Sequence, residues 1–344
     1  MSRRLRVVLT SVTAVAALGL TGCAGGGSSD TAGSGASAGA KTTGTVSIYG
    51  YSVAKQVYSQ LIPGFQATDA GKGIQFQQSY GASGDQSRKV GAGAQADIVS
   101  FSVEPDVTRL VDAGIVDPSW NSGQYKGIPF GSVVAIVVRK GNPKGIKDWD
   151  DLLKPGVSVV TPNPFSSGSA KWNLLAPYAV KSDGGKNPAA GLAYLTKLIT
   201  QHVHVQPTSG REATETFVQG TGDVLLSYED EAIAAVKAGD AVQYFIPSQT
   251  FKIENPVAVT KNSKNPTAAK AFDDYLYTDA GQENIAEAGF RPVVKSIADK
   301  HGDTFPTPQK LWTIADLGGW PSVDKDLFTK GSGKIAVIYD KATK

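Results

Sequence analysis

Cysteine and histidine are nearly absent from this chain, and its charges are close to balance. Of 344 residues one is cysteine, Cys23, and three are histidine. A single cysteine excludes an intramolecular disulfide, and so few histidines leave little material for an imidazole metal centre. The 34 basic residues include Arg3, Arg4 and Arg6 near the N-terminus; without these three, 31 basic side chains stand against 31 acidic ones. This balance gives no electrostatic case for a nucleic-acid partner.

Motifs of nucleotide-binding and serine-dependent enzymes are missing or incomplete. Neither G-x-x-x-x-G-K-[ST] nor a strand-linked G-x-G-x-x-G stands at the junctions described below. "GASGD" starts like the G-x-S-x-G of hydrolases, but Asp85 occupies the last glycine position. "SVAK" (52–55) fits S-x-x-K, yet no S-D-N or K-T-G follows it. We predict no catalytic residue, and an anchored serine enzyme using Ser52 or Ser83 is the alternative from a different class.

The other ionisable candidates predict neither a metal centre nor a cofactor. His202 and His204 alternate in "HVHV", which would place both on one face of a strand, but no third ligand is evident nearby. Two acidic clusters are expected to mark solvated helix starts, where carboxylates suit the helix dipole: Asp148, Asp150 and Asp151, and Glu229, Asp230 and Glu231.

The N-terminal segment has the features of a secretion signal. "MSRRLRVVLTSVTAVAALGLTGC" has a basic start, a short apolar stretch and a small-residue end. Its last four residues, Leu20 to Cys23, resemble the lipobox of bacterial lipoproteins, whose cysteine is diacylated and becomes the new N-terminus. We predict a signal peptide over 1–22 and a lipidated Cys23 with a flexible Gly/Ser tether over 23–44. The mature protein is then held on the extracytoplasmic face of the cell membrane through its lipid only.

From Thr45 the chain alternates β-like apolar runs with longer amphipathic stretches, which predicts an α/β fold. Its length favours two lobes rather than one core. We assign 45–128 plus 256–344 to the first lobe and 129–255 to the second. The chain is expected to pass between the lobes, and to hinge, near 127–133 and 253–258.

Serine and glycine gather where apparent strands run into helices. Ligands of open α/β sheets bind at such junctions, beyond the carboxyl ends of the strands. The first turn of a helix offers unpaired backbone N–H groups and partial positive charge, which suit an anion. Any single junction could be a plain helix cap, but several in one chain favour a shared anion site. The junctions are "SYGASGDQ" (79–86), "NPFSSGSAK" (163–171), "PTSGREAT" (207–214) and, more weakly, "YGYSVAK" (49–55).

Several segments together resemble the sulfate-binding proteins of bacterial ABC importers. The resemblance runs in order from about Thr45 to about Trp320. It is carried by "SYGASGDQSRKV", "VRKGNPKGIKDWDDLLKPGVSVVTPNPFSSGSAKWNLLAPYAV", "REATETFVQGTGDVLLSYEDEA" and "AGFRP". It implies a two-lobed type II periplasmic-binding-protein fold, with the ligand in the cleft between the lobes.

The resemblance also implies how an anion is held. In that family a desolvated sulfate is bound by backbone amides, a serine hydroxyl and an indole N–H, without a cationic side chain. Tyr228 stands where the family commonly has tryptophan, and Ser52 stands where an acidic residue can support the site. The ligand-binding residues implied are Ser83 (hydroxyl and amide), the amides of Ser167, Gly168, Ser169 and Gly210, together with Tyr228 and Ser52.

The function implied is capture of sulfate for the permease subunits of an ABC transporter, by a protein expected to be a monomer. Within the same class the alternatives are thiosulfate, molybdate and phosphate, which are also oxyanions. The backbone itself would be the ligand-binding group, which explains why "TPNPFSSGSAKWN" has so many small residues: they keep the amides accessible.

Overall fold

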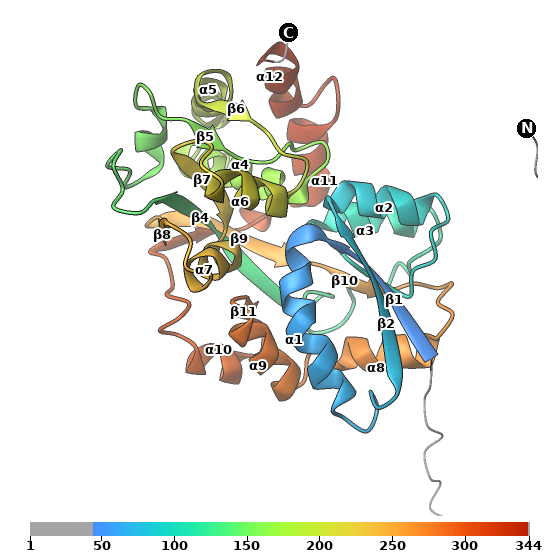
Figure 1. Ribbon diagram of the computed structural model, residues 1–344. Coiled ribbons are helices and arrows are strands. Elements are labelled where there is room, and N and C mark those ends of the chain that lie inside the picture. The colour runs from blue at the N-terminus through green and yellow to red at the C-terminus, as the bar shows by residue number, and fades with distance from the viewer. Residues whose placement is uncertain (1–43, 343–344) are drawn as a thin grey trace, which may run out of the picture. The chain divides into compact units, whose positions relative to one another are not determined.

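A computed structural model describes residues 44–342, so the predicted signal peptide, Cys23 and most of the tether lie outside the described residues. The described chain forms two β-sheets with helices packed against them (Figure 1). This architecture confirms the predicted α/β class. Between residues 44 and 342, no helix is both long and apolar enough to cross a membrane.

The smaller sheet has four strands in the order β10-β3-β1-β2. β1 is parallel to β2 and β3, whereas β10 is antiparallel to β3. Alternate residues face opposite sides, so Val46 and Ile48 join the core beneath α1 and α8, while Val99 and Phe101 pack with α2 and α3. The bounds are β1 (Gly44–Tyr51), β2 (Ile74–Gly81), β3 (Ile98–Ser100), β10 (Val257–Val259), α1 (Lys55–Gln66), α2 (Ser83–Gly91), α3 (Glu104–Asp112) and α8 (Pro266–Tyr275).

The larger sheet has eight strands, in the order β12-β9-β4-β7-β5-β6, with β8 and β11 also paired to β4. The apolar run of its central strand, "FGSVVAIVVR", is buried because helices cover both faces. Ile136 packs in the core with α4 and α5, and Val137 packs in the core with α6 and α7. The strands are β4 (Phe130–Arg139), β5 (Val159–Val160), β6 (Val203–Val205), β7 (Val224–Tyr228), β8 (Val242–Phe245), β9 (Gln249–Asn255), β11 (Arg291–Pro292) and β12 (Lys310–Trp312).

The remaining helices follow these strands along the chain. Short helical segments adjoin three of the helices: η1 (Ser52–Ala54) leads into α1, η3 (Leu198–His202) follows α5, and η5 (Asp324–Phe328) follows α11. The helices are α4 (Gly168–Lys181), α5 (Pro188–Lys197), α6 (Gly210–Val218), α7 (Glu229–Lys237), α9 (Asp279–Glu287), α10 (Lys295–Lys300), α11 (Trp320–Val323) and α12 (Lys334–Ala342).

The chain passes between the sheets at two neighbouring places. It enters β4 just after Gly127, and it leaves β9 for β10 between Asn255 and Val257. The Val257 amide donates to the Gly127 carbonyl over 2.9 Å, so the two crossings lie side by side. They fall within the segments expected to hinge, and the hinge motion and lobe boundaries stay predictions.

The last part of the chain, from β12 to α12, packs on the larger sheet, whereas the sequence predicts all of 256–344 to belong to the first lobe. β12 pairs with β9, and α12 contacts α5 and η3. The Trp320 ring of α11 lies against Trp172 of α4, with 4.8 Å between ring centroids. The apolar pattern of such a helix shows that it must cover a core, but it does not show which core.

Candidate anion-binding site

The predicted strand-to-helix junctions meet between the two sheets. The Gly84 amide, at the start of α2, donates to the Ser166 carbonyl just before α4 over 3.1 Å. The Arg211 amide, at the start of α6, donates to Ser52 Oγ in η1 over 3.3 Å. Each bond joins a junction of the smaller sheet to a junction of the larger one. Residues that the sequence spreads over more than 150 positions are therefore neighbours in space.

Two glycines allow the helix starts to approach this closely. A methyl group built on Gly168 would lie 2.5 Å from Ser102 Oγ, and one built on Gly210 would lie 2.7 Å from Ser169 Oγ. Both separations are too short for any real side-chain carbon. Glycine is required here by close packing between segments and leaves the backbone amides open to a small ligand.

The first turn of α4 has no side-chain cap. Ser167 occupies the N-cap position, with φ −105° and ψ 122°, yet its side chain does not bond the helix. Its own amide donates to the Asn163 carbonyl over 2.9 Å and is already engaged. The Ser167 hydroxyl makes no hydrogen bond with any described residue, and the residue is 3% exposed. The Ser167 hydroxyl and the Gly168 and Ser169 amides therefore form one group of donors.

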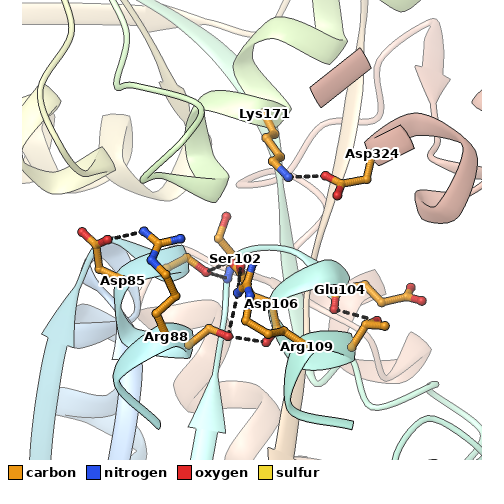
Figure 2. A network of polar contacts seen from close by, with 11 residues as sticks. Asp85, Arg88, Ser102, Glu104, Asp106, Arg109, Lys171 and Asp324 are labelled. Carbon is orange, nitrogen blue, oxygen red and sulfur yellow. Dashed lines mark hydrogen bonds and ion pairs between the residues drawn. The ribbon is translucent and has the colours of Figure 1, made fainter. Parts of the chain in front are cut away.

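The start of α2 is organised differently. Ser83 Oγ donates to Asp106 Oδ2 over 2.6 Å and accepts from the Ser102 amide over 3.0 Å. The other Asp106 oxygen accepts from Arg109 over 2.8 Å, so the carboxylate is held on both sides (Figure 2). A serine hydroxyl can donate one hydrogen bond, and here Asp106 accepts it. While that bond holds, Ser83 offers an anion its amide and not the hydroxyl donor that the sequence also predicted.

Tyr228 lies at the end of β7 and is completely buried. Its hydroxyl is 2.6 Å from Ser102 Oγ, and the side chains of Ser169 and Asn255 lie beside it. Burial raises the pKa of Tyr228, and these three polar neighbours offset only part of the rise. The phenol therefore keeps its proton at neutral pH and remains a donor at the start of α4.

Four cations around these junctions are paired with nearby carboxylates. Arg109 bonds Asp106 at 2.8 Å, and Arg211 bonds Glu231 at 2.6 Å. Figure 2 shows two further pairs, Arg88 with Asp85 and Lys171 with Asp324. At the helix starts themselves the favourable field for an anion comes from backbone dipoles and amides, whereas Lys330, which forms no ion pair with a described residue, lines the neighbouring cavity.

A cavity of about 270 Å³ opens beside the α4 start. Ser167 and Gly168 line it together with Gly84, Asp106 and Lys171. A second cavity of about 380 Å³ lies elsewhere, beside Trp120, Tyr125 and Tyr277, and none of the predicted site residues lines it. The chemistry of the first cavity fits a small anion that accepts hydrogen bonds.

Comparison with known proteins identifies the family. The bacterial extracellular solute-binding proteins match this chain over residues 46–291. The chain belongs to this family. This agrees with the predicted periplasmic-binding-protein fold, and the relatives below are named as binding proteins, in line with the prediction of no enzyme activity.

Three members show how similar this solute-binding protein is to characterised ones. The solved structure of the sulfate-binding protein SubI from Mycobacterium tuberculosis is 58% identical, with a TM-score of 0.82 over 83% of this chain and 99% of that one. The sulfate-binding protein of Synechococcus elongatus is 40% identical over 83% of this chain and 84% of its own length. The thiosulfate-binding protein of Pseudomonas aeruginosa is 36% identical over 84% of this chain and 90% of its own length.

One residue of the site was missed in the sequence. Ser102 follows β3, is fully buried and touches Ser83, Tyr228 and Gly168. Its junction, "VSFSVEP", has no glycine and therefore does not match the Ser/Gly pattern of the other junctions. The available signal was its place after a short apolar strand and just before a helix with proline at its second residue.

The second acidic cluster does begin a helix, but the expectation that it is solvated was wrong. Glu229, Asp230 and Glu231 open α7 and are at most 1% exposed. Glu229 forms two bonds with Arg291, and Glu231 pairs with Arg211. Burial raises the pKa of all three carboxyls. The first turn of α7 packs against β4, which the helical pattern alone did not reveal. In the other cluster, Asp148 and Asp150 are exposed as expected.

The histidine pair does not share a strand face. His202 ends the π-helix η3, is buried and places Nδ1 2.9 Å from the Val157 carbonyl, whereas His204 is exposed on β6. The strand begins one residue after His202, so the expected alternation fails. Among residues 44–342, no group of three or more potential ligands could hold a metal ion.

Proposed function

We propose that this protein captures sulfate outside the cytoplasm and delivers it to the permease subunits of an ABC transporter. The bound anion lies between the two sheets, at the residues predicted from the sequence: Ser52, Ser83, Ser167, Gly168, Ser169, Gly210 and Tyr228. The names of SubI and of the Synechococcus relative, both sulfate-binding proteins, support this ligand.

The observation that carries the proposal is the meeting of two helix starts that no side chain caps. The Gly84 amide of α2 bonds the Ser166 carbonyl just before α4, and neither helix has a side chain that caps its first turn. The amides left uncapped at Gly168 and Ser169 suit an oxyanion, which accepts several hydrogen bonds at once. The α6 start differs, because Ser209 accepts from the Glu212 amide and leaves fewer donors free.

The donor set also favours sulfate over phosphate. Sulfate at neutral pH has no proton, whereas phosphate keeps at least one and needs an acceptor for it. Two carboxylates line this cavity: both oxygens of Asp106 are engaged by Ser83 and Arg109, and Asp324 is paired with Lys171. A phosphate proton without a partner would cost about 1 to 3 kcal/mol, so sulfate should bind at least about tenfold more tightly at pH 7.

Calorimetric titration of the purified fragment from residue 44 onward tests the proposal. The panel contains sulfate, thiosulfate, molybdate and phosphate at pH 7. Saturable binding of intact sulfate, without turnover, is expected. Preference for thiosulfate would support the ligand named for the Pseudomonas relative, and equal affinity for phosphate would show that a carboxylate enters the site. Labelling of Ser52 or Ser83 by a serine acylator would favour the enzyme alternative.

The proposed location rests on the N-terminal segment. Diacylation of Cys23, which becomes the new N-terminus when residues 1–22 are removed, anchors the protein to the membrane by lipid, with the tether between lipid and fold. Two acyl chains are needed for a stable anchor, as the diacylated cysteine provides. A Cys23→Ser protein is expected to leave the membrane fraction. If it stays there after signal cleavage, another anchor holds it.

Delivery further requires that the permease distinguish loaded from empty protein. We propose that a monomer closes about the crossings at 127–133 and 253–258 when amides of both lobes meet one anion. Saturating sulfate should then reduce the radius of gyration in small-angle scattering. An unchanged radius would contradict closure.

A further inference from the structure

Ser102 joins four segments through all three of its polar groups. Its amide donates to Ser83 Oγ at the α2 start over 3.0 Å. Its carbonyl accepts from Trp172 Nε1 of α4 over 2.8 Å and from Asn255 Nδ2 of β9 over 3.3 Å. Its hydroxyl lies 2.6 Å from the Tyr228 hydroxyl. Ser102 follows a strand of the smaller sheet, whereas Asn255 and Tyr228 belong to the larger sheet and Trp172 to α4, which packs on it.

A count of protons shows what the hydroxyl pair can offer. Ser102 and Tyr228 have one hydroxyl proton each, and the bond between them uses one. The second proton is left for an acceptor outside the pair. Both oxygens border the α4 start, because Ser102 Oγ packs against Gly168 and the Tyr228 hydroxyl lies beside the Ser169 side chain. An anion held by the Gly168 and Ser169 amides is therefore within the reach of that second proton.

The direction of the internal bond follows from the chemistry of the two groups. A phenol is a stronger acid than an aliphatic alcohol and gives the stronger hydrogen bond to an anion. The favoured arrangement has Ser102 donating to Tyr228 and Tyr228 donating to the anion. Accepting the Ser102 proton polarises the phenol further, as in other buried hydroxyl chains.

We propose that Ser102 is a positioning residue for sulfate binding, which acts through Tyr228 by orienting and polarising its hydroxyl. This inference rests on the proposed function. Because the two hydroxyls come from different sheets, the donor is assembled only when the Ser102 and Tyr228 segments are in contact. Ser102 thus links contact between the sheets to the strength of one hydrogen bond to the ligand.

A double-mutant cycle tests the proposal, with sulfate affinity measured by calorimetry on the folded fragment. Ser102→Ala is expected to weaken binding about fivefold, which corresponds to one net hydrogen bond. Tyr228→Phe is expected to weaken it at least about tenfold, since a bond to a charged group is lost. In the Tyr228→Phe background, adding Ser102→Ala should change the affinity less than about twofold, because Ser102 acts only through the phenol.

Ser182→Ala is the matched control. Ser182 is also fully buried, and its hydroxyl accepts from the Gly185 amide over 2.9 Å at the opposite end of α4. Its loss should lower the unfolding temperature without sulfate about as much as Ser102→Ala does, and leave the sulfate affinity unchanged. Should Ser102→Ala not fold, Ser102→Cys replaces it, since a thiol of similar size is only a weak donor.

The outcomes separate the inference from the proposed function. Unchanged affinity in Ser102→Ala, or an equal loss in both backgrounds, overturns the role of Ser102 while sulfate binding by the wild type stands. A wild type that does not bind sulfate overturns both. A fivefold loss that disappears in Tyr228→Phe supports the inference.

Discussion

The starts of α2 and α4 each have a serine, Ser83 as the first residue of α2 and Ser167 as the N-cap of α4, and the two hydroxyls have different surroundings. The Ser83 hydroxyl donates a hydrogen bond to one oxygen of Asp106, and Arg109 bonds the other oxygen. The Ser167 hydroxyl has no hydrogen-bond partner among the described residues, and Ser167 borders the cavity. The α2 start is thus a fixed wall of the site, and the α4 start supplies donors that a ligand can use. The hydroxyl of a serine next to a helix start can donate to a bound anion only when no other group in the protein accepts its hydrogen bond.

The largest expected effect tests how closely the α4 start must approach the smaller sheet. In Gly168→Ala the new methyl group would lie 2.5 Å from Ser102 Oγ and 2.6 Å from Ser102 Cβ. Ser102 is fully buried and cannot give way, so the first turn of α4 must move out. We expect sulfate affinity, measured by calorimetry, to fall about a hundredfold.

Gly91→Ala in α2 is the control for that substitution. Its methyl group would meet its nearest neighbour, Leu110, at an ordinary 3.6 Å. Affinity should stay at the wild-type value, because Gly91 is at the far end of α2 from the site. Wild-type affinity in Gly168→Ala would show that the two segments need not touch for binding.

A smaller effect compares the two serines directly. Ser167→Ala should weaken sulfate binding by about tenfold to a hundredfold, as expected for a hydrogen bond to a charged group, with little change in the unfolding temperature. Ser83→Ala should do the reverse: it leaves a buried carboxylate oxygen of Asp106 without its donor, which costs about 1 to 3 kcal/mol of stability. Thermal unfolding without sulfate and calorimetry with sulfate separate the two. Equal losses of sulfate affinity in the two variants would contradict the different roles assigned to the Ser83 and Ser167 hydroxyls.

The smallest effect on binding is expected for a carboxylate that stabilises the smaller sheet away from the site. Burial alone would raise the pKa of Asp97, but hydrogen bonds from Ser263, Ser47 and the Lys264 amide lower it overall. A carboxyl whose pKa is lower in the folded state contributes stability above its unfolded pKa of about 4, and this is lost as the pH falls through the folded value. Asp97→Asn should therefore reduce the unfolding temperature at pH 7, and the difference from the wild type should shrink below about pH 4.

Sulfate affinity at pH 7 should not change in Asp97→Asn. The substitution lowers the stability of the smaller sheet without touching any junction, since Asp97 contacts Ser47 in the middle of β1, away from Ser52. A large loss of affinity would mean that stability of the sheet, rather than the identity of the junction residues, governs binding.

Much of the site was readable in the sequence because its signals are local. The serines and glycines of "SSGS" and "ASGD" stand next to apolar runs, and a helix start after a strand has the same physical properties in any α/β protein. Ser102 could not be found this way, since its junction contains no glycine. Its importance comes from partners up to 153 positions away.

The sequence by itself determined the alternation of strands and helices, the places where backbone amides are uncapped, and the near absence of metal ligands. These depend on periodicity and on neighbours within a few residues. Tertiary structure decided which hydroxyl groups already donate to other groups of the protein, which carboxylates are buried and which sheet the C-terminal helices cover. Hydrogen-bond pairing and burial depend on side chains brought together from distant segments, and a local pattern holds no record of them.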